Sequence, residues 1–336
     1  MKKFKSLIVL FILCCLFAVC SVNYLYPLAN SEYVYLGGFT AGFTLKTRGA
    51  TVVGITEVVS KNGCVSPCKC AGLEIGDIIL TMNESEINTA SDIDKVLKNY
   101  TSGVIVTEIL RGNQKKLVDL FPEKDLLGNF KLGLFIRDDL TGLGTVTFIT
   151  DEGIFASLGH PVSNEQGEIY NLKSGDVYES TIVGVNKASR GHAGELKGMF
   201  LGSKPIGKIS INTSVGLFGS ITKFNPLNYV KIPVGYAKIG KAEILSTVDG
   251  QNSKKYDIEI VKTDSRIGNN KNYVIKITDK ELLEYTGGIL QGMSGSPIIQ
   301  EGKLVGAVTH VFINDSSRGY GISINNMLDM LSSLKK

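Results

Sequence analysis

Histidine is scarce in this sequence, with only His160, His192 and His310 among 336 residues, so chemistry that needs an imidazole has three candidates. Charge of one sign is also lacking, because 36 basic and 32 acidic side chains are interspersed and leave a net charge of +4. A nucleic-acid-binding surface needs a basic stripe with interleaved aromatic residues, and the sequence has none. Long segments with helical periodicity are few. We therefore expect neither a nucleic-acid partner nor a mainly helical fold.

The sequence instead has 38 glycines and many short runs rich in Val, Ile and Thr. Such runs, separated by turn residues, are typical of β-strands. With 336 residues, of which 43% are hydrophobic, the chain is long enough to form more than one core. Composition thus predicts a mainly β protein with two domains and an appendage.

The predicted appendage lies at the N-terminus. Three lysines among the first five residues precede an apolar run over residues 7–22. This run is between the length of a signal-peptide core and the roughly 20 residues of a membrane span. Basic residues before it favour export of the rest of the chain. We predict a membrane anchor over residues 1–30, with a removed signal segment as the alternative.

The six cysteines fall in two groups, three in the apolar run and three in one loop, at Cys64, Cys68 and Cys70. Three thiols in an exported loop allow one disulfide with one thiol left over, or an incomplete metal site. Because no histidine lies near them in sequence, we interpret them as structural. We expect no metal site and no cofactor.

Residues 35–122 resemble a bacterial PDZ domain. The motifs that carry this resemblance are Ser66-Pro67, Ala71-Gly72-Leu73 and Gly-Asp-Ile-Ile-Leu at residues 76–80. In such a domain an open sheet edge takes up an extended peptide, and free backbone N–H groups bind its terminal carboxylate. The resemblance implies that Ala41, Gly42 and Phe43 form this peptide-binding loop. A small packing domain without a ligand is the alternative.

A serine between glycines stands near the C-terminus, in Gly-Met-Ser-Gly-Ser-Pro at residues 292–297. Glycines allow a tight turn that exposes the Ser294 hydroxyl and points nearby N–H groups at a developing oxyanion. The N–H groups of Gly292 and Ser294 are the candidates for that oxyanion hole. Ser296 is expected only to support the turn. For an isolated Gly-Ser-Gly, a plain hairpin turn is the alternative.

A nucleophilic serine needs a general base, and His160 is the best candidate because it ends an apolar strand after an Asp-Glu-Gly turn. His192 lies in a polar loop and is interpreted as a surface residue. His310, 16 residues after Ser294, is either a wall of the substrate (S1) pocket or a packed strand residue. Gly288 is the second candidate for that pocket. No acidic residue stands between Gly287 and Met293, which argues against a preference for basic substrates.

The carboxylate that would orient the base is not determined by spacing. Asp279 ends an apolar strand 15 residues before Ser294, but Asp257 is nearly as good a candidate. For any one of these aspartates, a solvated turn residue is the alternative. The remaining candidates between the histidine and the serine are Asp176, Asp249 and Asp264.

Several of these motifs together resemble the SpoIVB family of sporulation signalling serine peptidases. They are Leu158-Gly159-His160, Ile277-Thr278-Asp279, the 291–300 segment around Ser294, and Gly-Ala-Val-Thr-His at residues 306–310. The resemblance implies a PDZ domain followed by a chymotrypsin-like double β-barrel peptidase domain over residues 126–336. It also implies the catalytic set His160, Asp279 and Ser294.

The same resemblance implies where the protein acts and what it cleaves. It predicts a membrane-associated serine endopeptidase, located between the forespore and mother-cell membranes, that cuts itself and a membrane-bound regulator. Those cuts would trigger intramembrane proteolysis and activation of a late sigma factor. Two alternatives remain: a catalytically inactive, membrane-anchored PDZ adaptor, favoured by the unusual loop after His160, and an HtrA-like quality-control protease.

Overall fold

The computed structural model describes residues 33–112, 114–164, 167–264 and 270–334. The anchor predicted over residues 1–30 lies outside these ranges. Within them, no helix is both long and apolar enough to cross a membrane.

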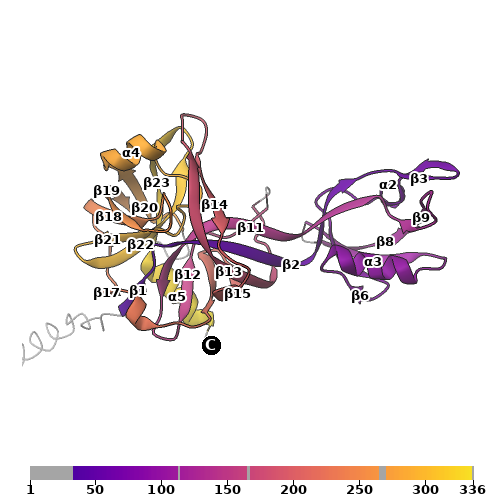
Figure 1. The fold of residues 1–336 in the computed structure, drawn as a ribbon, viewed down its shortest axis with the longest axis horizontal. Helices are drawn as coiled ribbons and strands as arrows, with labels where there is room; N and C mark the ends of the chain where they lie inside the picture. The colour runs from indigo at the N-terminus through magenta and orange to yellow at the C-terminus, as the bar shows by residue number, and fades with distance from the viewer. Residues whose placement is uncertain (1–32, 113, 165–166, 265–269, 335–336) are drawn as a thin grey trace, which may run out of the picture.

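Two strands, β2 (Thr40–Ile55) and β11 (Leu134–Ile149), connect the two parts of the molecule (Figure 1). They pair antiparallel from Leu134 opposite Ile55 to Thr145 opposite Thr40. A strand of 16 residues spans about 50 Å, so each strand is long enough to belong to both parts. The N-terminal half of β2 and the C-terminal half of β11 lie in the larger body, and the other halves lie in a smaller lobe.

We call residues 50–137 the distal lobe. Ten short elements follow one another between the two long strands, and their apolar faces enclose a core that includes Val52, Ile79 and Ile105. In chain order they are β3 (Val58–Ser60), β4 (Gly63–Val65), α2 (Pro67–Cys70), β5 (Ile78–Met82), β6 (Ser85–Glu86), α3 (Ala90–Asn99), β7 (Ile105–Arg111), β8 (Gln114–Leu120), β9 (Glu123–Lys124) and β10 (Phe130–Lys131).

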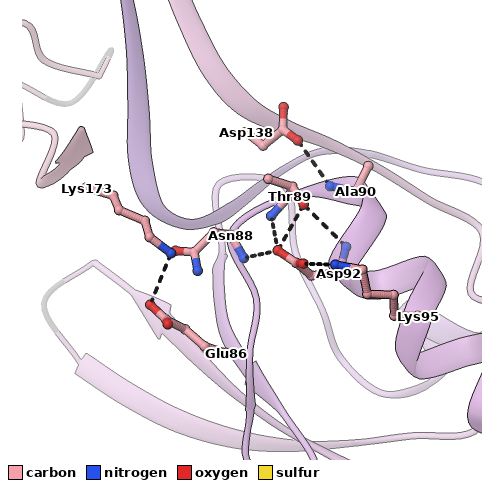
Figure 2. A network of polar contacts seen from close by, with 8 residues as sticks. All are labelled: Glu86, Asn88, Thr89, Ala90, Asp92, Lys95, Asp138 and Lys173. Carbon is pink, nitrogen blue, oxygen red and sulfur yellow. Dashed lines mark hydrogen bonds and ion pairs between the residues drawn. The ribbon is translucent and has the colours of Figure 1, made fainter. Parts of the chain in front are cut away.

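Helix α3 begins at a reciprocal cap, which Figure 2 shows. The Thr89 hydroxyl accepts a hydrogen bond from the Asp92 N–H at 3.3 Å, and the Asp92 carboxylate accepts one from the Thr89 N–H at 3.0 Å. These bonds satisfy backbone donors that a helix start leaves free. Asp138 of β11 accepts from the Ala90 N–H at 3.1 Å, which fixes the start of α3 beside the long strand.

The first barrel is closed by the pairing of β2 with β11. Strand neighbours run β11, β12, β16, β15, β13, β2 and back to β11. Its core includes Phe43, Val146 and Phe155. Apart from β2 and β11, the elements of this barrel and the segments attached to it are β1 (Tyr33–Leu36), β12 (Ile154–Ser157), β13 (Leu172–Asn186), β14 (Glu195–Phe200), β15 (Gly207–Thr213), β16 (Gly216–Ile221), η1 (Pro226–Asn228) and β17 (Lys231–Pro233).

The second barrel is a closed circuit of six strands, in the order β18, β19, β20, β23, β22 and β21. Helix α5 follows it and packs Ile324, Met327 and Leu331 into a core shared with first-barrel residues such as Phe148. The elements are β18 (Gly240–Ser246), β19 (Lys254–Thr263), β20 (Tyr273–Ile277), α4 (Lys280–Thr286), β21 (Pro297–Gln300), β22 (Lys303–Phe312), β23 (Asp315–Ser323) and α5 (Ile324–Leu334).

The predicted mainly β fold is confirmed, but the order of the parts differs from the linear one expected for residues 35–122 and 126–336. Residues 41–47 of β2 pair with β13 of the first barrel, and β1 pairs with β11 and β17. The distal lobe is therefore an insertion between two strands of the first barrel. A β-branched run in the sequence does not reveal that its two halves pair with different partners.

Candidate active site

A cavity of about 730 Å³ lies between the two barrels and contains Ser294, His160 and His310. Phe43 and Leu45 of β2 and residues 140–143 of β11 form the first-barrel wall. The turn before β21 and the end of β22 form the second-barrel wall. Chain segments that are far apart in sequence thus meet at Ser294.

The turn around Ser294 depends on glycines on both sides of this residue. Gly292 and Gly295 have φ angles of 97° and 93°, a region that other residues rarely adopt. A Cβ on Gly295 would approach the Thr145 carbonyl oxygen to 2.1 Å, so only glycine fits there. Ser296 is fully buried, and its hydroxyl donates to Ser246 Oγ at 3.0 Å. Ser296 therefore supports the turn from below.

Two threonines of β11 tie this turn to the first barrel. The Thr145 N–H donates to the Ser294 carbonyl at 2.9 Å, and its hydroxyl donates to the Gly292 carbonyl at 3.2 Å. The Thr147 hydroxyl donates to the Gly295 carbonyl at 2.8 Å. Both threonines are fully buried. Sequence reasoning missed them, although polar residues at alternate positions of an apolar strand were a usable signal.

The carbonyl groups of Gly292 and Ser294 are thus occupied, whereas their N–H groups donate to no acceptor in the described part of the chain. Ser294 Oγ donates to the Thr309 carbonyl of β22 at 2.7 Å. This arrangement presents a hydroxyl and two adjacent free donors at the cavity wall, which is the composition that acyl transfer requires.

His160 follows β12 through a tight turn in which Leu158 and Gly159 both have positive φ angles. Its Nδ1 lies 2.9 Å from the Pro161 carbonyl oxygen. A carbonyl only accepts, so Nδ1 carries the proton and Nε2 carries the lone pair that a general base needs. Burial lowers the pKa of His160 below its ordinary value of 6.5. The ring is therefore neutral, and able to accept a proton, at neutral pH.

His310 packs directly against His160. The centroids of the His160 and His310 rings are 4.8 Å apart, with the planes tilted by 40°. Among the described residues, the buried Nδ1 of His310 has no hydrogen-bond partner. Burial, followed by the nearby His160 and Lys271, lowers the pKa of His310 to about 4. His310 thus lines the cavity and is uncharged at neutral pH.

The structure places Asp279 away from the cavity that His160 lines. Its carboxylate caps helix α4, where it accepts from the Leu282 N–H at 2.9 Å, and it also accepts from the Asp257 N–H at 3.3 Å. Asp279 is not among the residues that line the cavity. The described part of that lining contains no aspartate or glutamate, and its ionisable side chains are His160, Lys271 and His310. The motif spacing was compatible with a catalytic carboxylate, but a residue just before a helix is equally suited to be its cap.

Two further sequence predictions are corrected by the fold. Gly288 packs against Ser316, where an added Cβ would lie 2.2 Å from the Ser316 oxygen, and it does not line the cavity. Ala41, Gly42 and Phe43 form no loop, because they lie inside β2 with partners on both sides, in β11 and β13. Both edges of this segment are occupied, so it cannot pair with a peptide. His192 is exposed, as expected for a surface residue.

The distal lobe has a second cavity, of about 490 Å³. One side is helix α3, through Ile93 and Leu97, and the other is formed by residues 131–134 and Ile136, from the end of β10 into the start of β11. Residues 134–137 of β11 pair with β2 along one edge. No strand in the described ranges pairs with their other edge. The cavity therefore runs along an open strand edge beside an amphipathic helix.

Comparison with known proteins gives a family and a set of distant structures. A family model described as SpoIVB peptidase S55 matches residues 128–328. Among solved structures, the inactive form of the Rv3671c protease is 15% identical, with a TM-score of 0.32, covering 58% of this chain and 85% of that one. The active form of the protease, from M. tuberculosis, is 16% identical with a TM-score of 0.32, covering 57% of this chain and 74% of that one. No curated protein matches the chain.

Proposed function

The chain belongs to the SpoIVB peptidase S55 family and is a serine peptidase, and from this we propose that it is a signalling endopeptidase with Ser294 as nucleophile and His160 as general base. The observation that carries the proposal is the meeting of these two residues in one interdomain cavity with free N–H donors beside them. These two residues are also the histidine and the serine of the catalytic set that the family resemblance implies.

In the proposed reaction, Ser294 Oγ attacks the substrate carbonyl carbon and His160 Nε2 takes the hydroxyl proton. The resting Ser294 hydroxyl donates to the Thr309 carbonyl, so it must first rotate about its Cα–Cβ bond toward His160. The N–H groups of Gly292 and Ser294 bind the oxyanion, and each such donor contributes about 2.7 to 4 kcal/mol. His160 then protonates the leaving amine, and water hydrolyses the acyl enzyme by the same route.

The cavity lining supports a preference for uncharged or acidic substrate side chains. Phe43, Leu45 and Leu143 supply apolar surface, and Lys271 is the charged residue in the described lining. A carboxylate that would pair with a basic side chain is not among those residues. We therefore expect the enzyme to discriminate against Arg and Lys at the cleaved bond.

The distal lobe is proposed to act as a PDZ domain, with its peptide site at α3 and residues 131–136 in place of Ala41, Gly42 and Phe43. An extended peptide would add a strand to the free edge of β11 and place side chains against Ile93 and Leu97. Ile136 lines this groove, whereas the adjacent Phe135 is exposed and does not line it. Ile136→Asp should therefore abolish binding of a peptide that Phe135→Asp still binds.

The biological setting is proposed from the family and the N-terminal sequence. The apolar run over residues 7–22 would anchor the enzyme, and the body would act on the exported side of the membrane during sporulation. Its substrates would be the chain itself and a membrane-bound regulatory protein. Mass spectrometry of the exported protein should reveal a new N-terminus that is missing from Ser294→Ala.

Labelling with a fluorophosphonate tests the enzymatic proposal directly. We expect the wild-type protein to react and Ser294→Ala to be inert, with Ser296→Ala as the matched neighbour that still reacts. A wild-type protein that does not react would instead favour an anchored adaptor. Complete digestion of casein would favour a quality-control protease over a signalling enzyme.

A further inference from the structure

The groove between α3 and the start of β11 has an uneven distribution of charge. Most of its lining is apolar, but three carboxylates also line it, from Glu57, Asp94 and Asp125. Lys131 is the basic residue of the described lining. The groove therefore combines an apolar surface, an open strand edge and an excess of negative charge.

The three carboxylates are not equally available to a ligand. Asp125 accepts a hydrogen bond from the Asn129 N–H at 2.8 Å, so it stabilises its own loop. That bond contributes most to the lowered pKa of Asp125, and the charge of nearby Lys131 also contributes. Within the described ranges, by contrast, the carboxylates of Glu57 and Asp94 take part in no hydrogen bond or ion pair, and both residues are exposed. Asp125 and Lys131 thus offset each other, which leaves Glu57 and Asp94 to set the charge of the groove.

Asp94 lies where a bound peptide would place a side chain. It lines the groove together with Ala90, Ile93 and Leu97, and spacings of three and four residues put all four on one face of α3. A peptide strand added to the edge of β11 that no described strand occupies would point alternate side chains toward this face. A basic side chain there gains an ion pair with Asp94, whereas an acidic one is repelled.

We propose that the α3 groove selects peptides that carry a Lys or Arg side chain, and that Asp94 is the residue that pairs with it. Glu57 adds negative charge where β11 begins, because it follows Thr56, whose N–H donates to the Gly133 carbonyl at 2.8 Å. The proposal rests on the proposed peptide-binding function of the distal lobe and names the class of its ligand. The proposed enzyme discriminates against the same side chains at the cleaved bond, so docking and cleavage use different parts of one substrate.

The test compares two fluorescein-labelled peptides, Thr-Val-Lys-Lys-Val and Thr-Val-Glu-Glu-Val, both with a free C-terminus. Binding is measured by fluorescence anisotropy on the full chain carrying Ser294→Ala, so that neither peptide is cut. Neighbouring side chains of a strand point to opposite sides, so one member of the charged pair faces α3 in either register.

The lysine peptide should bind about 10-fold tighter than the glutamate peptide, because an ion pair with Asp94 replaces a repulsion of similar size. The difference should fall to about twofold in about 1 M salt, where charges more than about 3 Å apart are screened. Asp94→Lys should reverse the preference. Asp119→Lys is the matched control, because Asp119 is an exposed carboxylate of β8 that does not line the groove.

Melting temperatures of all variants separate loss of folding from loss of selection. The proposal is wrong if the glutamate peptide binds as tightly as the lysine peptide, or if Asp94→Lys keeps the original preference at an unchanged melting temperature. If the two peptides bind equally and Ile136→Asp abolishes both, the groove is still the peptide site and only its selection by charge is refuted. If neither peptide binds, the peptide-binding function of the distal lobe is refuted together with the proposal.

Discussion

The contact between the first barrel and the serine turn leads to a sharp prediction for Thr147→Val. This substitution keeps the shape of the side chain and removes the hydroxyl that donates to the Gly295 carbonyl at 2.8 Å. Because Thr147 is fully buried, water cannot replace the lost donor. Leaving the carbonyl unsatisfied should cost about 1 to 3 kcal/mol of unfolding free energy. That range corresponds to roughly a 5- to 150-fold change in the unfolding equilibrium.

The assay is urea unfolding followed by circular dichroism, since the chain has no Trp. Labelling of Ser294 by a fluorophosphonate under native conditions should slow as well, because the turn loses a support adjacent to the nucleophile. Thr107→Val is the control, since Thr107 is also fully buried but makes only a 3.3 Å contact with the Ile105 carbonyl, in the distal lobe. If Thr147→Val is no less stable than this control and labels at the wild-type rate, the Thr147 hydrogen bond does not support the turn.

Three other perturbations test the site and the distal lobe. The rate of Ser294 labelling should fall on the acid side with a midpoint below pH 6.5, because burial lowers the pKa of His160 and its ring stays neutral to lower pH. A midpoint above pH 6.5 in the labelling rate would indicate a carboxylate partner. The hydrogen bond from Thr89 lowers the pKa of Asp92 from 3.8 to about 2, so this carboxylate stabilises the folded distal lobe above about pH 4 and loses that effect as pH falls toward 2. Asp92→Asn should flatten this pH dependence in urea unfolding, and an unchanged slope would contradict the cap. Ile136→Asp should abolish peptide binding by the distal lobe in fluorescence anisotropy, while Phe135→Asp should retain it; equal binding by both would exclude the α3 groove.

The sequence was sufficient for features that depend on local chemistry. The glycines around Ser294 specify a turn that other residues cannot adopt, and the short apolar run that ends at His160 specifies a strand delivering a side chain to its end. The amphipathic spacing of Met327, Leu328 and Leu331 likewise matches the buried face of helix α5. In each case the residues that determine the structure are neighbours in the chain.

Features that depend on pairing between distant segments were decided only by the tertiary structure. The segment at Ala41 and Phe43 was predicted to be a loop, and the fold makes it a strand paired on both edges, since nothing local marks a strand's partners. Asp279 had suitable spacing, yet α4 uses its carboxylate as a cap. The contact of His310 with His160 joins residues 150 positions apart, and it exists only because the two barrels close on each other. The sequence by itself therefore determined the serine turn, the strand end that carries His160 and the mainly β fold, whereas tertiary packing decided what surrounds His160, because that depends on which strands meet.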